Sequence, residues 1–164
     1  MRNSSLVKWL CAENVTGLKP VTEATDFGGQ SSEVRSRRKK TIQSYQDLEV
    51  YKRSYKLALE IHKIAQTFPD MERQELGSQI RRSAVSITLN IAEGYGRKDS
   101  AAEFKHFLRN ALGSCNETRV LVDIAADLGY LNKEQHLRWS KEYEVLSKQL
   151  YRLKEAWTKK KSDI

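Results

Sequence analysis

Apolar side chains recur every three or four residues along most of the chain after residue 44, a pattern that predicts amphipathic helices. Short breaks divide it into four segments, expected at about 45–67, 72–93, 100–129 and 132–157. Segments of similar length joined by short loops favour an all-α fold, an antiparallel up-down-up-down four-helix bundle. Heptad rows mark the core edges of the last two segments: Phe104, Leu108, Ala111, Cys115, Thr118, Val122 and Ala125, then Trp139, Tyr143, Leu146, Leu150, Leu153 and Trp157.

The first two segments show broader apolar patterns and clear end signals. The first has two rows, one of Leu57, Ile61, Ile64 and Phe68 and another of Leu48, Tyr51, Tyr55 and Ala58. The second has Leu76, Ile80, Ala84, Ile87 and Ile91, and Gly94 and Gly96 are expected to end it in the left-handed conformation, as Gly129 ends the third. Three pairs have the spacing of a capping box: Ser44 with Asp47, Ser100 with Glu103 and Asn132 with Gln135.

Residues 1–43 lack a sustained period, so we expect a mostly disordered tail before a bundle at 44–164. An alternative is that this stretch is a start outside the native protein. The net charge of the chain is +8, and residues 1–43 carry 8 of the 29 basic and 4 of the 21 acidic side chains. Basic runs at 35–40 and 159–161 are typical either of polyanion binding or of a solvated terminus.

Composition excludes several function classes. No apolar run approaches the roughly 18 residues that a membrane span needs. The 2 cysteines, Cys11 and Cys115, cannot form a disulfide framework. Both observations favour a cytoplasmic protein. Glu103 and His106 form a single E-x-x-H unit without the second copy of a di-iron bundle. No nucleophile elbow or phosphate loop is present. We therefore expect no catalytic residue, metal or cofactor, and an enzyme with a site between subunits is the least favoured class.

Ser83, Ser86, Thr88 and Asn90 place polar side chains in the otherwise apolar second segment, so they should have hydrogen-bond partners. We expect a structural polar layer of Ser86, Asn90, Glu93 and Glu117, with Glu117 as ionic partner of Arg82. This layer fits either helix register or a ligand site, and Gly113 and Ser114 would allow close helix approach. Basic side chains form stripes that could follow phosphates or be a solvated face. The candidate nucleic-acid contacts are Arg81, Arg82, Arg97, Lys98, Lys105, Arg109, Lys141, Lys148 and Arg152.

Several runs of the chain carry a family resemblance. They are residues 45–51, the run Asn90-Ile91-Ala92-Glu93-Gly94 within residues 79–94, residues 113–117 and residues 128–131. With these runs the chain resembles the four-helix-bundle proteins encoded by intervening sequences of 23S ribosomal RNA genes. It is also distantly similar to the accessory variability protein of diversity-generating retroelements.

The resemblance implies a homo-pentamer without catalytic activity and with a nucleic-acid-binding role. We therefore expect a non-enzymatic, self-associating bundle that binds structured RNA or DNA through phosphates, without base-specific readout. The alternative is an assembly or adaptor protein whose partner is another protein.

Overall fold

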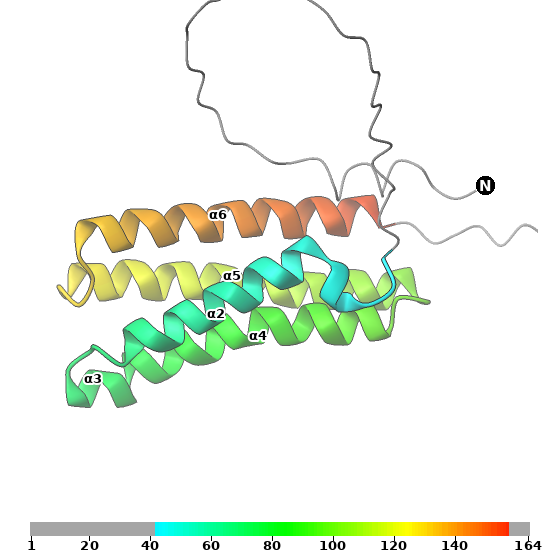
Figure 1. The fold of residues 1–164 in the computed structure, drawn as a ribbon. Coiled ribbons are helices and arrows are strands. Elements are labelled where there is room, and N and C mark those ends of the chain that lie inside the picture. The colour runs from blue at the N-terminus through cyan, green and yellow to red at the C-terminus, as the bar shows by residue number, and fades with distance from the viewer. Residues whose placement is uncertain (1–41, 158–164) are drawn as a thin grey trace, which may run out of the picture. The chain divides into compact units, whose positions relative to one another are not determined.

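Four long helices lie side by side in the structure, a computed structural model that describes residues 42–157 (Figure 1). The helix α2 packs on α4, α4 on α5 and α5 on α6, while α2 and α6 touch less. No strand occurs in this range, so the predicted all-α up-down bundle is confirmed. The elements are the 3-10 turn η1 (Tyr45–Asp47) and the helices α2 (Glu49–Ala65), α3 (Asp70–Gln74), α4 (Leu76–Gly96), α5 (Ala101–Asp127) and α6 (Lys133–Ala156).

Two predicted regions lie outside the described residues. They are the tail at 1–43, apart from its last two positions, and the basic run at 159–161.

The core consists of the predicted heptad rows. All seven members of the α5 row have no exposed surface, and the α6 row is buried from Trp139 to Leu153. Phe104 receives the ring of Trp157 at a centroid distance of 4.4 Å, which closes the end of the bundle where α6 finishes. In α2 the prediction fails at Tyr55, which is 51% exposed because that position turns outward beside α4. Burial of these rows supplies the main stabilising free energy of the bundle.

The first two helices begin differently from the predicted boundaries. Ser44 and Asp47 do form a cap, with the Ser44 N–H donating to Asp47 Oδ2 at 3.1 Å, but they close the short turn η1. The extended backbone of Leu48 then separates η1 from α2. The second predicted helix is likewise broken at Glu75 into α3 and α4. At Leu48 the apolar rhythm continues through the interruption, so periodicity alone does not reveal it. Residues 72–75 contain no apolar side chain and the predicted row begins at Leu76, so periodicity gives no signal for the break at Glu75.

The later helix ends agree with the capping signals. Ser100 accepts the N–H of Glu103 at 3.3 Å, and Asn132 and Gln135 exchange two hydrogen bonds of 2.9 Å. Gly129 has φ 78°, which confirms the left-handed stop after α5. The expectation for Gly94 and Gly96 is wrong, because α4 runs through both, and Gly129 is the glycine with positive φ among the described residues.

Close approach of α4 and α5 depends on Gly94 and not on Gly113. A Cβ atom at Gly94 would lie 2.7 Å from Phe107 Cβ and 2.9 Å from Phe104 Cδ2. At Gly113 it would meet no atom within 4 Å, since this residue is exposed on the outer side of α5. The expectation that Gly113 permits close packing is therefore wrong.

The two glycines give a matched test of this packing. We expect Gly94→Ala to lower the free energy of unfolding by about 1–3 kcal/mol, because α4 and α5 must separate. We expect Gly113→Ala to raise it by about 0.5–1 kcal/mol, since alanine in an exposed helix has the better propensity. Urea denaturation followed by circular dichroism measures both. Equal effects of the two substitutions would contradict the assigned contact.

Candidate nucleic-acid interface

Five of the predicted cations gather on one surface. On α5, positions 105, 109, 112 and 116 follow a 4-3-4 spacing and share the flank that borders α6. Positions 141, 144, 148, 151 and 152 lie along the outer side of α6. We call this surface the α5–α6 face, and its members are Lys105, Arg109, Leu112, Asn116, Lys141, Glu144, Ser147, Lys148, Tyr151, Arg152 and Glu155.

A groove of ≈ 410 Å³ lies in the α5–α6 face. It is lined by Leu112, Asn116, Ser147, Lys148, Tyr151 and Arg152. Lys148 Nζ donates to Glu144 Oε1 at 2.5 Å, and this hydrogen bond lowers the pKa of the exposed Glu144 carboxyl. The groove therefore combines basic groups, amide and hydroxyl groups and one exposed aromatic ring.

The other four predicted cations lie elsewhere: Arg81 and Arg82 belong to α4, and Arg97 and Lys98 follow its end. Arg81 Nη2 donates to the backbone oxygen of Arg73 at 3.2 Å. Arg97 pairs with Glu93 at 3.2 Å and with Glu103 at 3.6 Å. The ammonium of Lys98 lies 4.4 Å from the centre of the Tyr95 ring. These three cations have partners within the chain.

Arg82, by contrast, is exposed and makes no ion pair with any described residue. Because α4 and α6 lie on opposite sides of the bundle (Figure 1), the structure does not bring Arg81 and Arg82 to the cations of α6.

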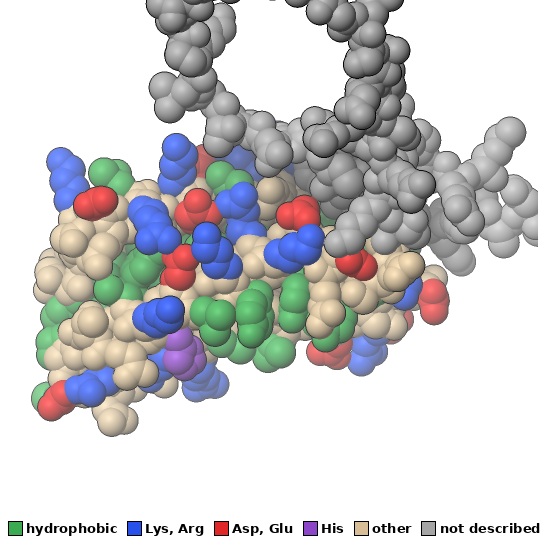
Figure 2. Space-filling view, in the orientation of Figure 1, with side chains coloured by type: hydrophobic (Ala, Val, Ile, Leu, Met, Phe, Trp, Pro, Cys, Tyr) green, Lys and Arg blue, Asp and Glu red, His purple; other side chains and the backbone are tan. Residues whose placement is uncertain are grey.

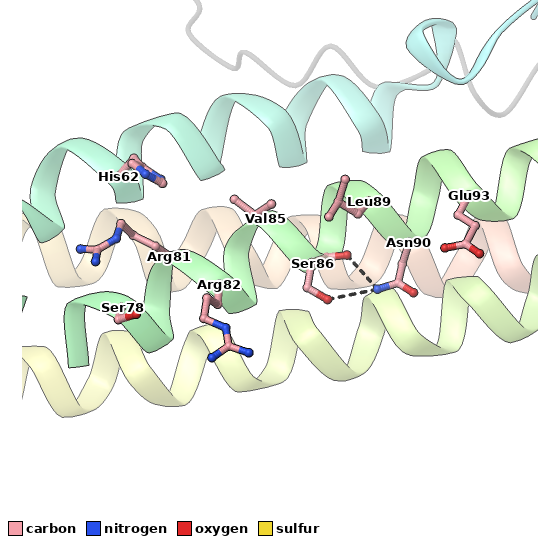
Figure 3. A pocket seen from close by; sticks show the side chains of 9 residues that line it. All are labelled: His62, Ser78, Arg81, Arg82, Val85, Ser86, Leu89, Asn90 and Glu93. Atoms are coloured by element: carbon pink, nitrogen blue, oxygen red, sulfur yellow. Dashed lines mark hydrogen bonds between the residues drawn. The ribbon is translucent and has the colours of Figure 1, made fainter. Parts of the chain in front are cut away.

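A second groove, of ≈ 580 Å³, lies over the outer side of α4 (Figure 3). Val85 and Leu89 point toward α2, and Arg82, Ser86 and Asn90 point toward α5. Tyr55 and Leu59 of α2, 51% and 50% exposed, and Leu89, 62% exposed, enlarge the apolar area. Figure 2 shows hydrophobic side chains gathered over α2 and α4. We call this surface the α2–α4 face, and its members are Tyr55, Leu59, His62, Ser78, Arg81, Arg82, Val85, Ser86, Leu89, Asn90 and Glu93.

Two of the four residues expected in the polar layer, Ser86 and Asn90, are half-buried and hydrogen-bonded. Asn90 Nδ2 donates to the Ser86 carbonyl at 2.8 Å, and Ser86 Oγ lies 3.0 Å from Ser114 Oγ across the α4–α5 interface. Glu93 and Glu117 are exposed. The expected ion pair of Glu117 with Arg82 does not occur among the described ion pairs, and both side chains are exposed.

Ser83 and Thr88, for which the sequence predicts hydrogen-bond partners, do have them. Thr88 Oγ1 donates to Ser54 Oγ at 3.0 Å, and Thr118 Oγ1 lies 2.9 Å from Ser83 Oγ. These four side chains are buried and link α2 to α4 and α4 to α5. Their satisfied hydrogen bonds indicate a role in helix register, since each hydroxyl has a fixed partner.

The uncharged groove residues of the α5–α6 face were not predicted from the sequence. Tyr151 lies between Leu150 and Leu153, off the buried row, and it and Leu137 are the exposed large apolar side chains of α6. An aromatic ring at such a position, one turn after Lys148, is the signal that could have identified it. Leu112, Asn116 and Ser147 carry no comparable signal, because only packing shows that α5 and α6 leave space between them.

Groups that could perform chemistry are separated or buried. Glu103 and His106 are both exposed, and Asn110 Nδ2 lies 3.3 Å from His106 Nε2. Residues 42–157 contain no group of three or more His, Cys, Asp or Glu side chains placed to hold a metal ion. In the same range no helix combines the length and the apolar character needed to cross a bilayer. Burial raises the pKa of the Cys115 thiol to about 11.

Comparisons with known proteins agree with this fold. The family described as 23S rRNA-intervening sequence protein matches residues 46–152. A crystal structure of a protein with unknown function from the S23 ribosomal protein family of Bacteroides thetaiotaomicron superposes with a TM-score of 0.60 and 25% identity. The superposition covers 65% of this chain and 96% of that one. No curated protein matches the sequence.

The buried thiol gives a test of the core that α5 and α6 form. In a Cys11→Ser background Cys115 is the remaining cysteine, and a pKa near 11 leaves little thiolate at pH 8. We expect Ellman's reagent to react at pH 8 at least about tenfold more slowly with the folded protein than with the protein in urea. The rate for folded protein should rise as the pH increases toward 11. A thiol that reacts equally fast in both states would show that this core is open.

Proposed function

The chain belongs to the 23S rRNA-intervening sequence protein family, and we propose that it is a non-enzymatic helical scaffold that self-associates and binds RNA or DNA through phosphates. The observation that supports binding is the α5–α6 face, where five basic side chains outnumber two carboxylates, Glu144 and Glu155. Lys105, Arg109 and Lys141 make no ion pair with a described residue, so their charges are available to a polyanion. Phosphates are the matching ligand, because regularly spaced cations release counterions when they bind a nucleic-acid backbone.

Self-association is supported by the α2–α4 face. Exposed apolar side chains from two helices adjoin one groove, and such a patch is typical of a surface that another protein covers. Basic Arg82 and acidic Glu93 lie toward opposite ends of this groove on α4 (Figure 3). A second copy of the chain offers both charges to meet them, so we assign the α2–α4 face to contacts between copies. The α5–α6 face then stays accessible to nucleic acid.

An adaptor that binds another protein is the second candidate, and the α2–α4 face is the observation in its favour. The mass of the purified protein distinguishes the two. A scaffold covers this face with copies of itself, whereas an adaptor leaves it exposed for a different partner.

Binding is tested by removing two cations from the α5–α6 face. We expect Lys148→Ala with Arg152→Ala to weaken binding of a fluorescent RNA hairpin and to reduce the slope of log K against log salt by about 2, one for each lost phosphate contact. The matched control is Lys56→Ala with Lys63→Ala on the outer side of α2, which changes net charge equally. Fluorescence anisotropy over a salt series measures both. Equal losses in the two variants, or no binding by the native chain, would contradict the proposed face.

Self-association is tested at Leu89. We expect the native protein to have the molar mass of a pentamer of the 18.9 kDa chain. We expect Leu89→Glu to yield smaller species, because a carboxylate buried in the contact lacks a partner. Leu137→Glu on α6 is the control, since Leu137 is 59% exposed and Leu89 is 62% exposed. Light scattering after size exclusion measures the masses. A native monomer, or the same mass for both variants, would refute self-association through this face.

A further inference from the structure

An exposed aromatic ring stands among the cations of the α5–α6 face. Tyr151 is 54% exposed although it lies well inside α6, where the neighbours Leu150 and Leu153 are fully buried. Its ring lines the groove between α5 and α6, and Lys154 Nζ lies 4.7 Å from its centre. Apart from this contact with Lys154, no described contact requires an aromatic side chain here, since a half-exposed ring contributes little to the core.

We propose that this groove binds an unpaired nucleotide of a single strand, with the base stacked on Tyr151 and the phosphate held by Lys148 and Arg152. This inference rests on the proposed function and names its ligand: single-stranded RNA or DNA in preference to a duplex. Aromatic side chains beside basic grooves bind single strands in this way, because every base has a π-face that can stack. A duplex keeps its bases stacked on one another, so it offers only phosphates to this surface.

The spacing along α6 places cations on both sides of the ring. Lys148 precedes Tyr151 by three residues and shares its side of the helix, and Arg152 follows it directly. Four residues separate the two cations, which corresponds to a rise of about 6 Å. A strand that runs along α6 would therefore meet positive charge before and after the stacked base.

The remaining lining suits a base and a sugar. Leu112 is half-buried and provides an apolar floor. Asn116 and Ser147 make no side-chain hydrogen bond to a described residue, which leaves an amide and a hydroxyl for the polar edge of the ligand. The groove volume of ≈ 410 Å³ falls within the range of small-ligand sites, about 300–1,000 Å³.

Glu144 opposes binding in this arrangement. Its carboxylate accepts from Lys148 Nζ at 2.5 Å and occupies the ammonium that a phosphate would use. Phosphate binding must therefore displace or share this contact. Glu144→Gln removes this charge and should strengthen the binding of single strands. If the Glu144–Lys148 pair only stabilised α6, the substitution would instead weaken binding.

The experiment compares a fluorescent single-stranded oligonucleotide with the duplex of the same sequence by anisotropy. We expect Tyr151→Ala and Tyr151→Leu to weaken single-strand binding about tenfold or more, the effect of losing one stacked base. We expect Tyr151→Phe to bind normally because the ring remains, and duplex binding to stay unchanged in all three variants. Leu128→Ala, at an apolar side chain of similar exposure (52%) that ends α5 and belongs to neither face, is the control and should bind as the native chain does. Circular dichroism confirms that each variant is folded.

The outcomes separate the two proposals. Native single-strand affinity in Tyr151→Leu, or a loss in Tyr151→Phe as large as in Tyr151→Ala, would overturn stacking. Phosphate binding would still stand if the Lys148 and Arg152 double variant remained weaker than its control. If that double variant and its control bound equally, the proposed function itself would fail.

Discussion

Burial of the apolar side of α5 is the interaction on which the rest of the structure depends. This helix lies between α4 and α6, and its heptad row has no exposed surface along its length. Because α5 packs against α4 and also against α6, it sets the positions of two neighbouring helices. The α5–α6 face exists because α5 and α6 meet along their buried rows and leave their polar flanks outside. Its cations are thus aligned by packing in the core, although none of them takes part in that packing.

Charge and apolar area are distributed differently over the surface. The α5–α6 face is basic and has one exposed ring, while the α2–α4 face is apolar with basic and acidic groups at its two ends. Such a division allows one face to meet copies of the chain and another to meet a polyanion. The hydroxyl pairs inside the bundle fix the register of the helices that carry these faces. A shift of α4 along α5 would break the hydrogen bond between Thr118 and Ser83.

Much of the fold could be predicted from the sequence, because heptad spacing and caps act locally. The apolar rows of α5 and α6 lie where the pattern places them, and so do the helix starts at Ser100 and Asn132 and the stop at Gly129. The break at Leu48 escaped prediction because the apolar period passes through it. The break at Glu75 escaped prediction because residues 72–75 carry no apolar side chain that could show it. The function of Gly94 also escaped, because its close contact with Phe107 depends on how two helices cross. The candidate cations were visible in the sequence, but only packing separates those of α4 from those of α5 and α6.

Chemical footprinting of lysines tests the central claim, that the α5–α6 face meets nucleic acid, most directly. The native protein is acetylated with and without a single-stranded oligonucleotide, and mass spectrometry quantifies each site. We predict that Lys105, Lys141 and Lys148 become protected, while Lys52, Lys56 and Lys63 on α2 react as before. Protection confined to the lysines of α2, or no protection at any site when the strand is bound, would contradict the account.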